Sequence, residues 1–131
     1  MIALDTNVVV RFLVRGDAEQ FRRAQNLIRR EAHAGTPAYI SLLVLLETEW
    51  VLRSRYKLSK PEILGAFSDL LSAIEMSFED EPSIEEALFL WKDSAAQFAD
   101  CLIGAHHRTL GCSATATFDK ATKKLPGFVA A

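Results

Sequence analysis

Short apolar segments alternate with long helical patterns along this chain, and this alternation limits its possible folds more than any other feature. Four segments have the composition of β-strands: Ile2–Leu4, Ala38–Ser41, Met76–Phe78 and Ser113–Phe118. The residues between them have apolar side chains at the three- and four-residue spacing of helices. Strands that alternate with helices form parallel sheets covered by helices on both faces. We therefore expect one domain, residues 1–131, with a three-layer α/β/α sandwich and a short, mainly parallel central sheet.

Local signals predict several helix ends. Gly111 follows the apolar pattern of Phe98–Leu110, at the position of a C-terminal glycine cap. Gly104, a small residue within that pattern, allows another element to approach the predicted helix closely. Three pairs of residues have the spacing of an N-terminal capping box: Ser59 with Glu62, Ser83 with Glu86, and Ser94 with Gln97.

The net charge of −2 conceals an uneven distribution along the chain. Residues 1–60 carry a net charge of +4, residues 61–93 of −8 and residues 94–131 of +2. The acidic side chains of the middle segment interleave with apolar residues, which is typical of solvent-exposed helix faces. The basic first segment favours a polyanionic partner.

Simple features exclude several classes of protein. The apolar runs are too short for a membrane span, and Asp5 and Arg11 interrupt the apolar N-terminus, unlike a secretory signal. The absence of a glycine-rich phosphate loop argues against a P-loop nucleotide hydrolase. Cys101 and Cys112 form no disulfide framework, so we expect a cytoplasmic protein without a membrane partner.

Four carboxylates fall on the carboxyl side of the predicted sheet, where ligands of such sheets bind. Asp5 ends the first predicted strand and Asp119 ends the fourth, while Glu47 and Asp100 lie on the intervening helices. Each acid also has a structural explanation, because Asp5 and Asp119 are suited to cap helices and Asp100 suits a first helical turn. Glu49 has nearly as apolar a setting as Glu47, and spacing does not choose between them.

Carboxylates gathered at one edge repel one another unless a cation neutralises them. Oxygen ligands without His or Cys suit Mg²⁺ or Mn²⁺, which activate water and stabilise the charge that develops on a phosphodiester. Metal-dependent hydrolysis of a phosphate ester is therefore a hypothesis from the acids alone. A zinc site at His106, His107 and the two cysteines is disfavoured, since adjacent histidines on a helix point apart. We expect Trp50 and Trp91 in the core.

Four segments, in this order and at this spacing, resemble PIN domains, and specifically the toxin ribonucleases of the virulence-associated protein C (VapC) type. The segments are Met1–Arg11, Ser41–Leu52, Phe98–Ile103 and Thr117–Lys120. The resemblance covers essentially the whole chain. It implies the PIN-like α/β/α fold, a Mg²⁺- or Mn²⁺-dependent endoribonuclease, a homodimer, an RNA substrate and neutralisation by a cognate antitoxin.

The resemblance also implies roles for individual residues. Asp5, Glu47, Asp100 and Asp119 would form the acidic catalytic site, with Asp5 and Asp100 as the most direct metal ligands and Glu47 chosen over Glu49. The supporting residues would be Thr6, Asn7 and Thr117. One departure stands out, because Gln97 lies one turn before Asp100, where many relatives carry a further aspartate.

The arginines of the basic first segment are candidates for phosphate contacts in such an enzyme, especially Arg11, Arg15, Arg22, Arg53 and Arg55. A different class of function remains open, in which a PIN-like domain binds RNA or a protein and leaves its catalytic site unused. A receiver domain that accepts a phosphoryl group is disfavoured, since the first strand is not followed by paired acids.

Overall fold

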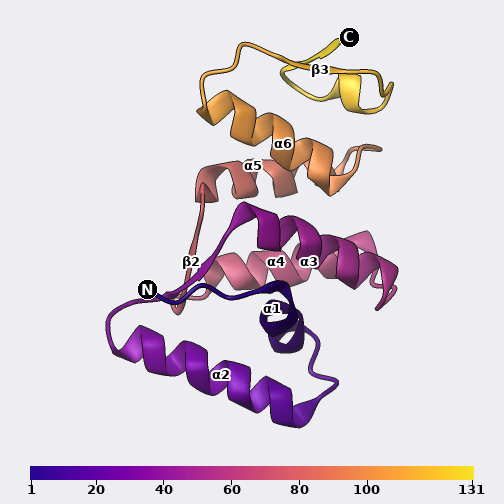
Figure 1. Ribbon diagram of the computed structural model, residues 1–131. Helices are drawn as coiled ribbons and strands as arrows, with labels where there is room; N and C mark the ends of the chain where they lie inside the picture. Colours follow the sequence, from indigo (N-terminus) through magenta and orange to yellow (C-terminus); the bar gives the residue numbers. More distant parts are fainter. The chain divides into compact units, whose positions relative to one another are not determined.

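The computed structural model describes residues 1–131 as six α-helices, one short 3₁₀ helix and four strands (Figure 1). The chain divides into two compact units, Met1–Glu79 and Asp80–Ala131, and each is described by itself. Both strand pairs are parallel, so the prediction of a mixed α/β fold with parallel strands is confirmed. None of the helices is long and apolar enough to cross a lipid bilayer.

The first unit contains four helices and one parallel strand pair. β1 pairs with β2 so that Tyr39 lies opposite Ser77. The predicted first strand is reduced to a single parallel bridge between Ala3 and Tyr39. The elements of this unit are α1 (Thr6–Leu13), α2 (Ala18–His33), β1 (Ala38–Ile40), α3 (Leu42–Ser54), α4 (Lys60–Ser72) and β2 (Met76–Phe78).

Side-chain caps set the helix starts of the first unit. Asp5 accepts a hydrogen bond from the backbone N–H of Val8 and caps α1, and Asp17 caps α2 in the same way through Gln20. Ser59 and Glu62 form the predicted capping box of α4. The helices bury aliphatic and aromatic side chains, and α1 packs against both α2 and α3. The fully buried side chains include Val9, Ile28, Ile40, Leu45, Leu52, Ile63 and Phe67.

The second unit contains two packed helices and a second parallel strand pair. Its elements are α5 (Glu81–Lys92), α6 (Phe98–Thr109), β3 (Thr115–Thr117), η1 (Thr122–Lys124) and β4 (Phe128–Ala130). α6 ends near Gly111, which has a φ of 90°, as the sequence predicts. A Cβ atom on Gly104 would meet the ring of Phe128, so the expected close approach to α6 comes from β4. The sequence interpretation missed this last strand.

Two predicted capping boxes are wrong. α5 begins at Glu81 rather than after Ser83, because the hydroxyl of Ser83 donates to the carboxylate of Asp80, the actual N-cap residue. Ser94 does not cap α6. Its hydroxyl oxygen accepts a hydrogen bond from the backbone N–H of Ala96 instead, and α6 begins at Phe98.

Asp80 is the centre of a hydrogen-bond network inside the second unit. Its Oδ2 atom accepts from the hydroxyl of Ser83 at 2.6 Å and from that of Thr109 at 3.0 Å, and lies 2.7 Å from Nδ1 of His106. Burial opposes the charge of Asp80, but the hydrogen bonds from His106, Ser83 and Thr109 outweigh it and hold its pKa below the ordinary value. The charged carboxylate therefore joins the start of α5 to the end of α6.

Asp80→Asn is expected to lower the free energy of unfolding at pH 6 by about 1 to 2 kcal/mol, because hydrogen bonds to a charged acceptor are the stronger ones. Asn tolerates the left-handed φ of 50° at this position, so the backbone is preserved. Since the folded pKa is lowered, the stability from Asp80 is present above its unfolded pKa of about 3.9 and is lost as the pH falls. Urea unfolding at pH 6 and pH 3 measures this. If the free energies of unfolding of the wild type and Asp80→Asn differ by the same amount at both pH values, the stabilising role of the charged carboxylate is contradicted.

Candidate functional site

The first two acids of the predicted site lie in the first unit, on neighbouring helices. Asp5 is exposed at the start of α1, where its Oδ1 atom accepts from the N–H of Val8 at 3.1 Å and its other oxygen has no protein partner. Glu47 lies on α3 and accepts a hydrogen bond from the buried hydroxyl of Thr6. Since Thr6 directly follows Asp5 in the chain, this bond ties Glu47 to the start of α1.

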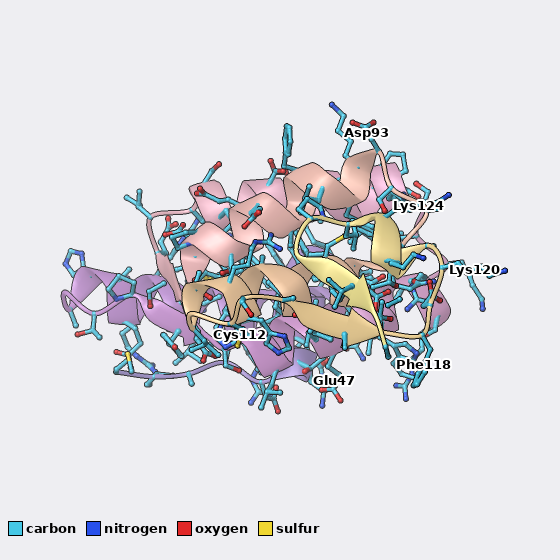
Figure 2. The ribbon with its side chains drawn as sticks, turned by 90° about the horizontal axis from the view of Figure 1, so that it is seen from above. Glu47, Asp93, Cys112, Phe118, Lys120 and Lys124 are labelled. Atoms are coloured by element: carbon cyan, nitrogen blue, oxygen red, sulfur yellow. The ribbon has the colours of Figure 1, made fainter.

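An open pocket of about 300 Å³ lies where α1 meets α3, and both acids line it. Figure 2 shows Glu47 on α3 with its side chain at the surface of the molecule. Among the other predicted site residues, Thr6, Asn7 and Arg55 line the same pocket. The pocket therefore brings together a carboxylate pair, a hydroxyl, an amide and a guanidinium group from two segments that lie 40 residues apart in the sequence.

Trp50 also lines this pocket, although the sequence interpretation places it in the core. Its side chain is 50% exposed, so that expectation is wrong, whereas Trp91 is buried as expected. α3 carries apolar residues on most of its circumference, so helical spacing alone did not show which face of the helix is accessible.

The two glutamates of α3 have different surroundings. Glu49 is buried, and its carboxylate accepts from Nε of Arg53 at 2.8 Å. This hydrogen bond raises the pKa of Arg53. Glu49 is thus neutralised by a cation one helical turn away, whereas Glu47 is exposed beside Asp5. Of the two glutamates, only Glu47 lines the pocket that contains Asp5.

The other two predicted acids lie in the second unit, each at a helix start. Asp100 is in the first turn of α6, where Oδ2 accepts from the backbone N–H of Gln97 at 3.2 Å. Asp119 follows β3 and is exposed, and its Oδ1 atom accepts from the N–H of Thr122 at 2.9 Å. The hydrogen bond from Thr122 holds the pKa of Asp119 below its ordinary value, so this carboxylate is charged at neutral pH.

The loop around Asp119 is held by its neighbours. The hydroxyl oxygen of Thr117 accepts a hydrogen bond from the N–H of Asp119 at 3.1 Å, so Thr117 orients the backbone of the acid. Phe118 and Lys120, on either side of Asp119, project outward from the loop (Figure 2). Phe118 is almost fully exposed, which leaves an aromatic ring and a cation next to the carboxylate.

The donor set of the four acids is made of oxygen atoms, which suits a hard divalent cation. Within either unit, no three side chains of His, Cys, Asp or Glu come together as metal ligands. Asp5 and Glu47 belong to the first unit, and Asp100 and Asp119 belong to the second. His106 and His107 are not free ligands. His106 contacts Asp80, and Nδ1 of His107 lies 2.8 Å from the hydroxyl of Thr115.

The predicted phosphate-contacting arginines have separate surroundings. Arg11 donates to the hydroxyl of Tyr56 at 3.1 Å, and the guanidinium of Arg15 lies 4.5 Å from the centre of the Phe21 ring. Two others are paired with acids, Arg22 with Glu19 and Arg53 with Glu49. Of this group, only Arg55 lines the pocket that contains Asp5 and Glu47.

Comparison with known proteins identifies the family of this chain. The sequence profile of the PIN domain matches residues 2–127, which include all four acids. The chain belongs to the PIN domain family. This PIN domain is also similar to a VapC ribonuclease of Aquifex aeolicus, with 26% identity over 125 residues that cover 95% of this chain and 92% of the relative. The resemblance found in the sequence is thereby confirmed at the level of the family.

Proposed function

We propose that this PIN domain is a Mg²⁺- or Mn²⁺-dependent endoribonuclease that acts as the toxin of a toxin–antitoxin pair. One observation carries the proposal: Asp5 and Glu47, which the sequence selects as functional acids, line the same open pocket. The similarity to a protein named VapC ribonuclease supports RNA as the substrate. The four acid-bearing segments occur in the order and spacing expected of such an enzyme.

Asp5 and Asp100 would hold the metal ion, and Glu47 and Asp119 would complete its negative surroundings. The fit is supported by Asp5, whose second carboxylate oxygen is uncommitted, and by the oxygen-only donor set. When bound, such an ion raises the acidity of a water molecule and stabilises the charge on the cleaved phosphodiester. Gln97, in place of a common family aspartate, lowers the negative charge near Asp100.

The remaining chemistry belongs to side chains of this protein. The hydroxyl of Thr6 holds one oxygen of Glu47, which leaves the other oxygen available to position a water molecule. Asp119 is charged at neutral pH, and its lowered pKa suits it to orient the attacking water rather than to take its proton. Arg55 at the edge of the pocket supplies a positive charge for a substrate phosphate.

A toxin of this kind works in the cytoplasm, as a homodimer, and is blocked by a cognate antitoxin. The antitoxin would be recognised by its ability to cover the acid pocket and suppress RNA cleavage in a mixture of the two purified proteins.

The purified protein is expected to cleave single-stranded RNA in the presence of Mg²⁺ or Mn²⁺, and to lose that activity in excess chelator. Adding back either ion should restore cleavage, because the acids and the fold remain intact. Gel analysis of a labelled RNA over time measures the rate. Cleavage that continues undiminished in chelator would contradict the metal-dependent mechanism. RNA binding without cleavage under any metal condition would favour the alternative of a catalytically unused binding domain.

A further inference from the structure

A second hollow in the first unit, which we call the arginine groove, lies between α1 and α2. It has a volume of about 560 Å³ and is lined by three arginines and three side-chain amides, with no acidic residue among its lining side chains. The arginines are Arg11 from α1 and Arg23 and Arg30 from α2. The groove is therefore a strongly positive concave surface, and the proposed cleavage chemistry uses none of these three residues.

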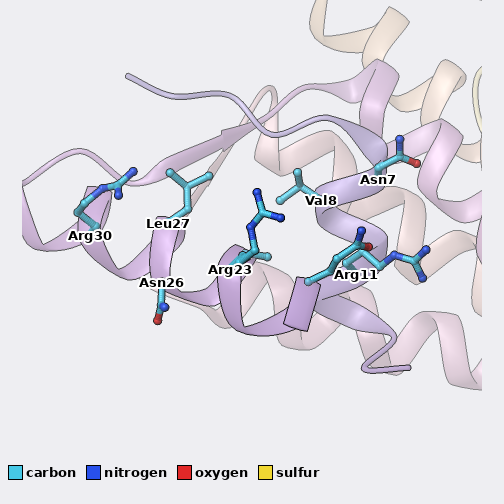
Figure 3. A pocket seen from close by; sticks show the side chains of 9 residues that line it. Asn7, Val8, Arg11, Arg23, Asn26, Leu27 and Arg30 are labelled. Atoms are coloured by element: carbon cyan, nitrogen blue, oxygen red, sulfur yellow. The ribbon is translucent and has the colours of Figure 1, made fainter. Parts of the chain in front are cut away.

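The positive charges of the groove are not compensated within the protein. Arg23 and Arg30 are exposed and form no ion pair with any Asp or Glu, in contrast to Arg22, which is paired with Glu19. Arg11 contacts only the neutral hydroxyl of Tyr56. Figure 3 shows Arg23 extending from α2 toward the space that Val8 faces from α1. These guanidinium groups are available to an anion.

The arginine groove and the acid pocket share one lining residue, Asn7. This residue lines the arginine groove together with Val8 and Arg11, and it lines the acid pocket together with Asp5 and Glu47. Because both hollows lie within the first unit and border the same residue, we infer that one extended ligand reaches both. Arg23 and Arg30 are seven residues apart on α2, which places them about 10 Å apart along the helix axis.

We propose that the arginine groove binds the phosphate backbone of single-stranded RNA on one side of the phosphodiester that is cleaved. A guanidinium group binds phosphate through two parallel hydrogen bonds, and two such groups two turns apart suit a ligand with repeated negative charges. The apolar lining is limited to Val8, Ala24 and Leu27, which favours a polyanionic strand over an amphipathic helix of a protein partner. This proposal rests on the proposed function. It assigns the main phosphate contacts to Arg23 and Arg30, which are not among the arginines selected from the sequence.

Adjacent arginines provide a matched test of this groove. Arg29 and Arg30 are neighbours on α2, both exposed and neither in an ion pair, but only Arg30 lines the groove. Binding of a fluorescein-labelled single-stranded RNA of about 20 nucleotides is measured by anisotropy for Arg30→Glu and Arg29→Glu, in excess chelator so that cleavage plays no part. We expect Arg30→Glu to weaken binding at least 10-fold and Arg29→Glu less than threefold. Circular dichroism checks that both variants fold.

The salt dependence of binding is a second measurement. Each lost phosphate contact lowers the slope of log affinity against log salt concentration by about 0.7 for a single strand, so Arg23→Gln/Arg30→Gln should lower it by about 1.4. Equal RNA affinities of the Arg29→Glu and Arg30→Glu variants would overturn the proposal. An acidic protein segment would then be the better candidate for the ligand of the groove. A loss of RNA affinity in Arg30→Glu but not in Arg29→Glu supports RNA binding in the arginine groove, even if the wild-type protein fails to cleave RNA. The binding result is therefore distinguishable from a failure of the proposed function.

Discussion

Asp5→Asn is expected to reduce metal-dependent RNA cleavage at least 100-fold and to leave the protein folded. The loss follows because Asn removes the negative charge with which Asp5 would hold a divalent cation, and catalytic charge stabilisation of this kind contributes about 3 to 4 kcal/mol. The fold is preserved because Asn caps a helix as well as Asp does. The hydrogen bond from Val8 at the start of α1 is therefore retained.

Asp17→Asn is the matched control. Asp17 caps α2 as Asp5 caps α1, with an extended backbone and a hydrogen bond from the residue three positions later, Gln20. It does not line the acid pocket. The control therefore makes the same chemical change at the same kind of helix start, without touching the proposed site, and its cleavage rate should stay within about threefold of the wild type.

Initial rates of RNA cleavage and circular dichroism spectra of the two variants distinguish the outcomes. Loss of activity in Asp5→Asn alone, with both proteins folded, is the expected result. If Asp5→Asn cleaves RNA as fast as Asp17→Asn, Asp5 is not a metal ligand and the proposed mechanism fails. If both variants unfold, loss of the helix caps rather than loss of the charge explains the missing RNA cleavage. Asp5→Ser, which keeps a capping side chain without the charge, then distinguishes the two explanations.

The sequence predicts the local setting of Asp5 but not the surroundings of the other acids. Asp5 is expected to cap a helix, and the structure places it at the start of α1, where it also lines the acid pocket. The spacing of apolar residues does not distinguish Glu47 from Glu49. The partner of Glu49, Arg53, lies one turn along the same helix and was a usable local signal, whereas the partner of Glu47, Thr6, lies on another helix. Of the groove arginines, Arg11 is among the phosphate-contact candidates of the sequence analysis, whereas Arg23 and Arg30 were missed. Periodicity shows which residues of α2 avoid the core, but not which of them face α1.

The start of a helix is predicted correctly where one capping residue acts alone. The prediction fails where a second residue competes for the same hydrogen bond. Ser59 has a partner only in Glu62, and the capping box forms as expected. Ser83 has the same spacing to Glu86, but its hydroxyl donates a hydrogen bond to the carboxylate of Asp80 and the helix begins earlier. β4 was missed for a related reason, since its three residues gain strand structure from pairing with β3 rather than from their own pattern.

Phe98→Ala is expected to lower the free energy of unfolding by about 3 to 5 kcal/mol, the range for removing a fully buried aromatic side chain. Phe98 is the first residue of α6 and is completely buried, with its ring centre 5.3 Å from that of Trp91 on α5. Truncation leaves a cavity between these helices and weakens the packing at the start of α6, two residues before Asp100. Thermal and urea unfolding monitored by circular dichroism measure the effect.

Phe89→Ala makes the same truncation on a neighbouring helix of the same unit, where the ring is 76% exposed. Its free energy of unfolding should change by no more than about 0.5 kcal/mol, because little apolar surface leaves a packed environment. A loss of similar size in both variants would show that burial of Phe98 does not stabilise this unit. Because Phe98 lies beside the turn that carries Asp100, Phe98→Leu, which keeps most of the buried volume, should recover both stability and RNA cleavage relative to Phe98→Ala. Recovery of stability without recovery of cleavage would instead indicate that the aromatic ring itself positions the start of α6.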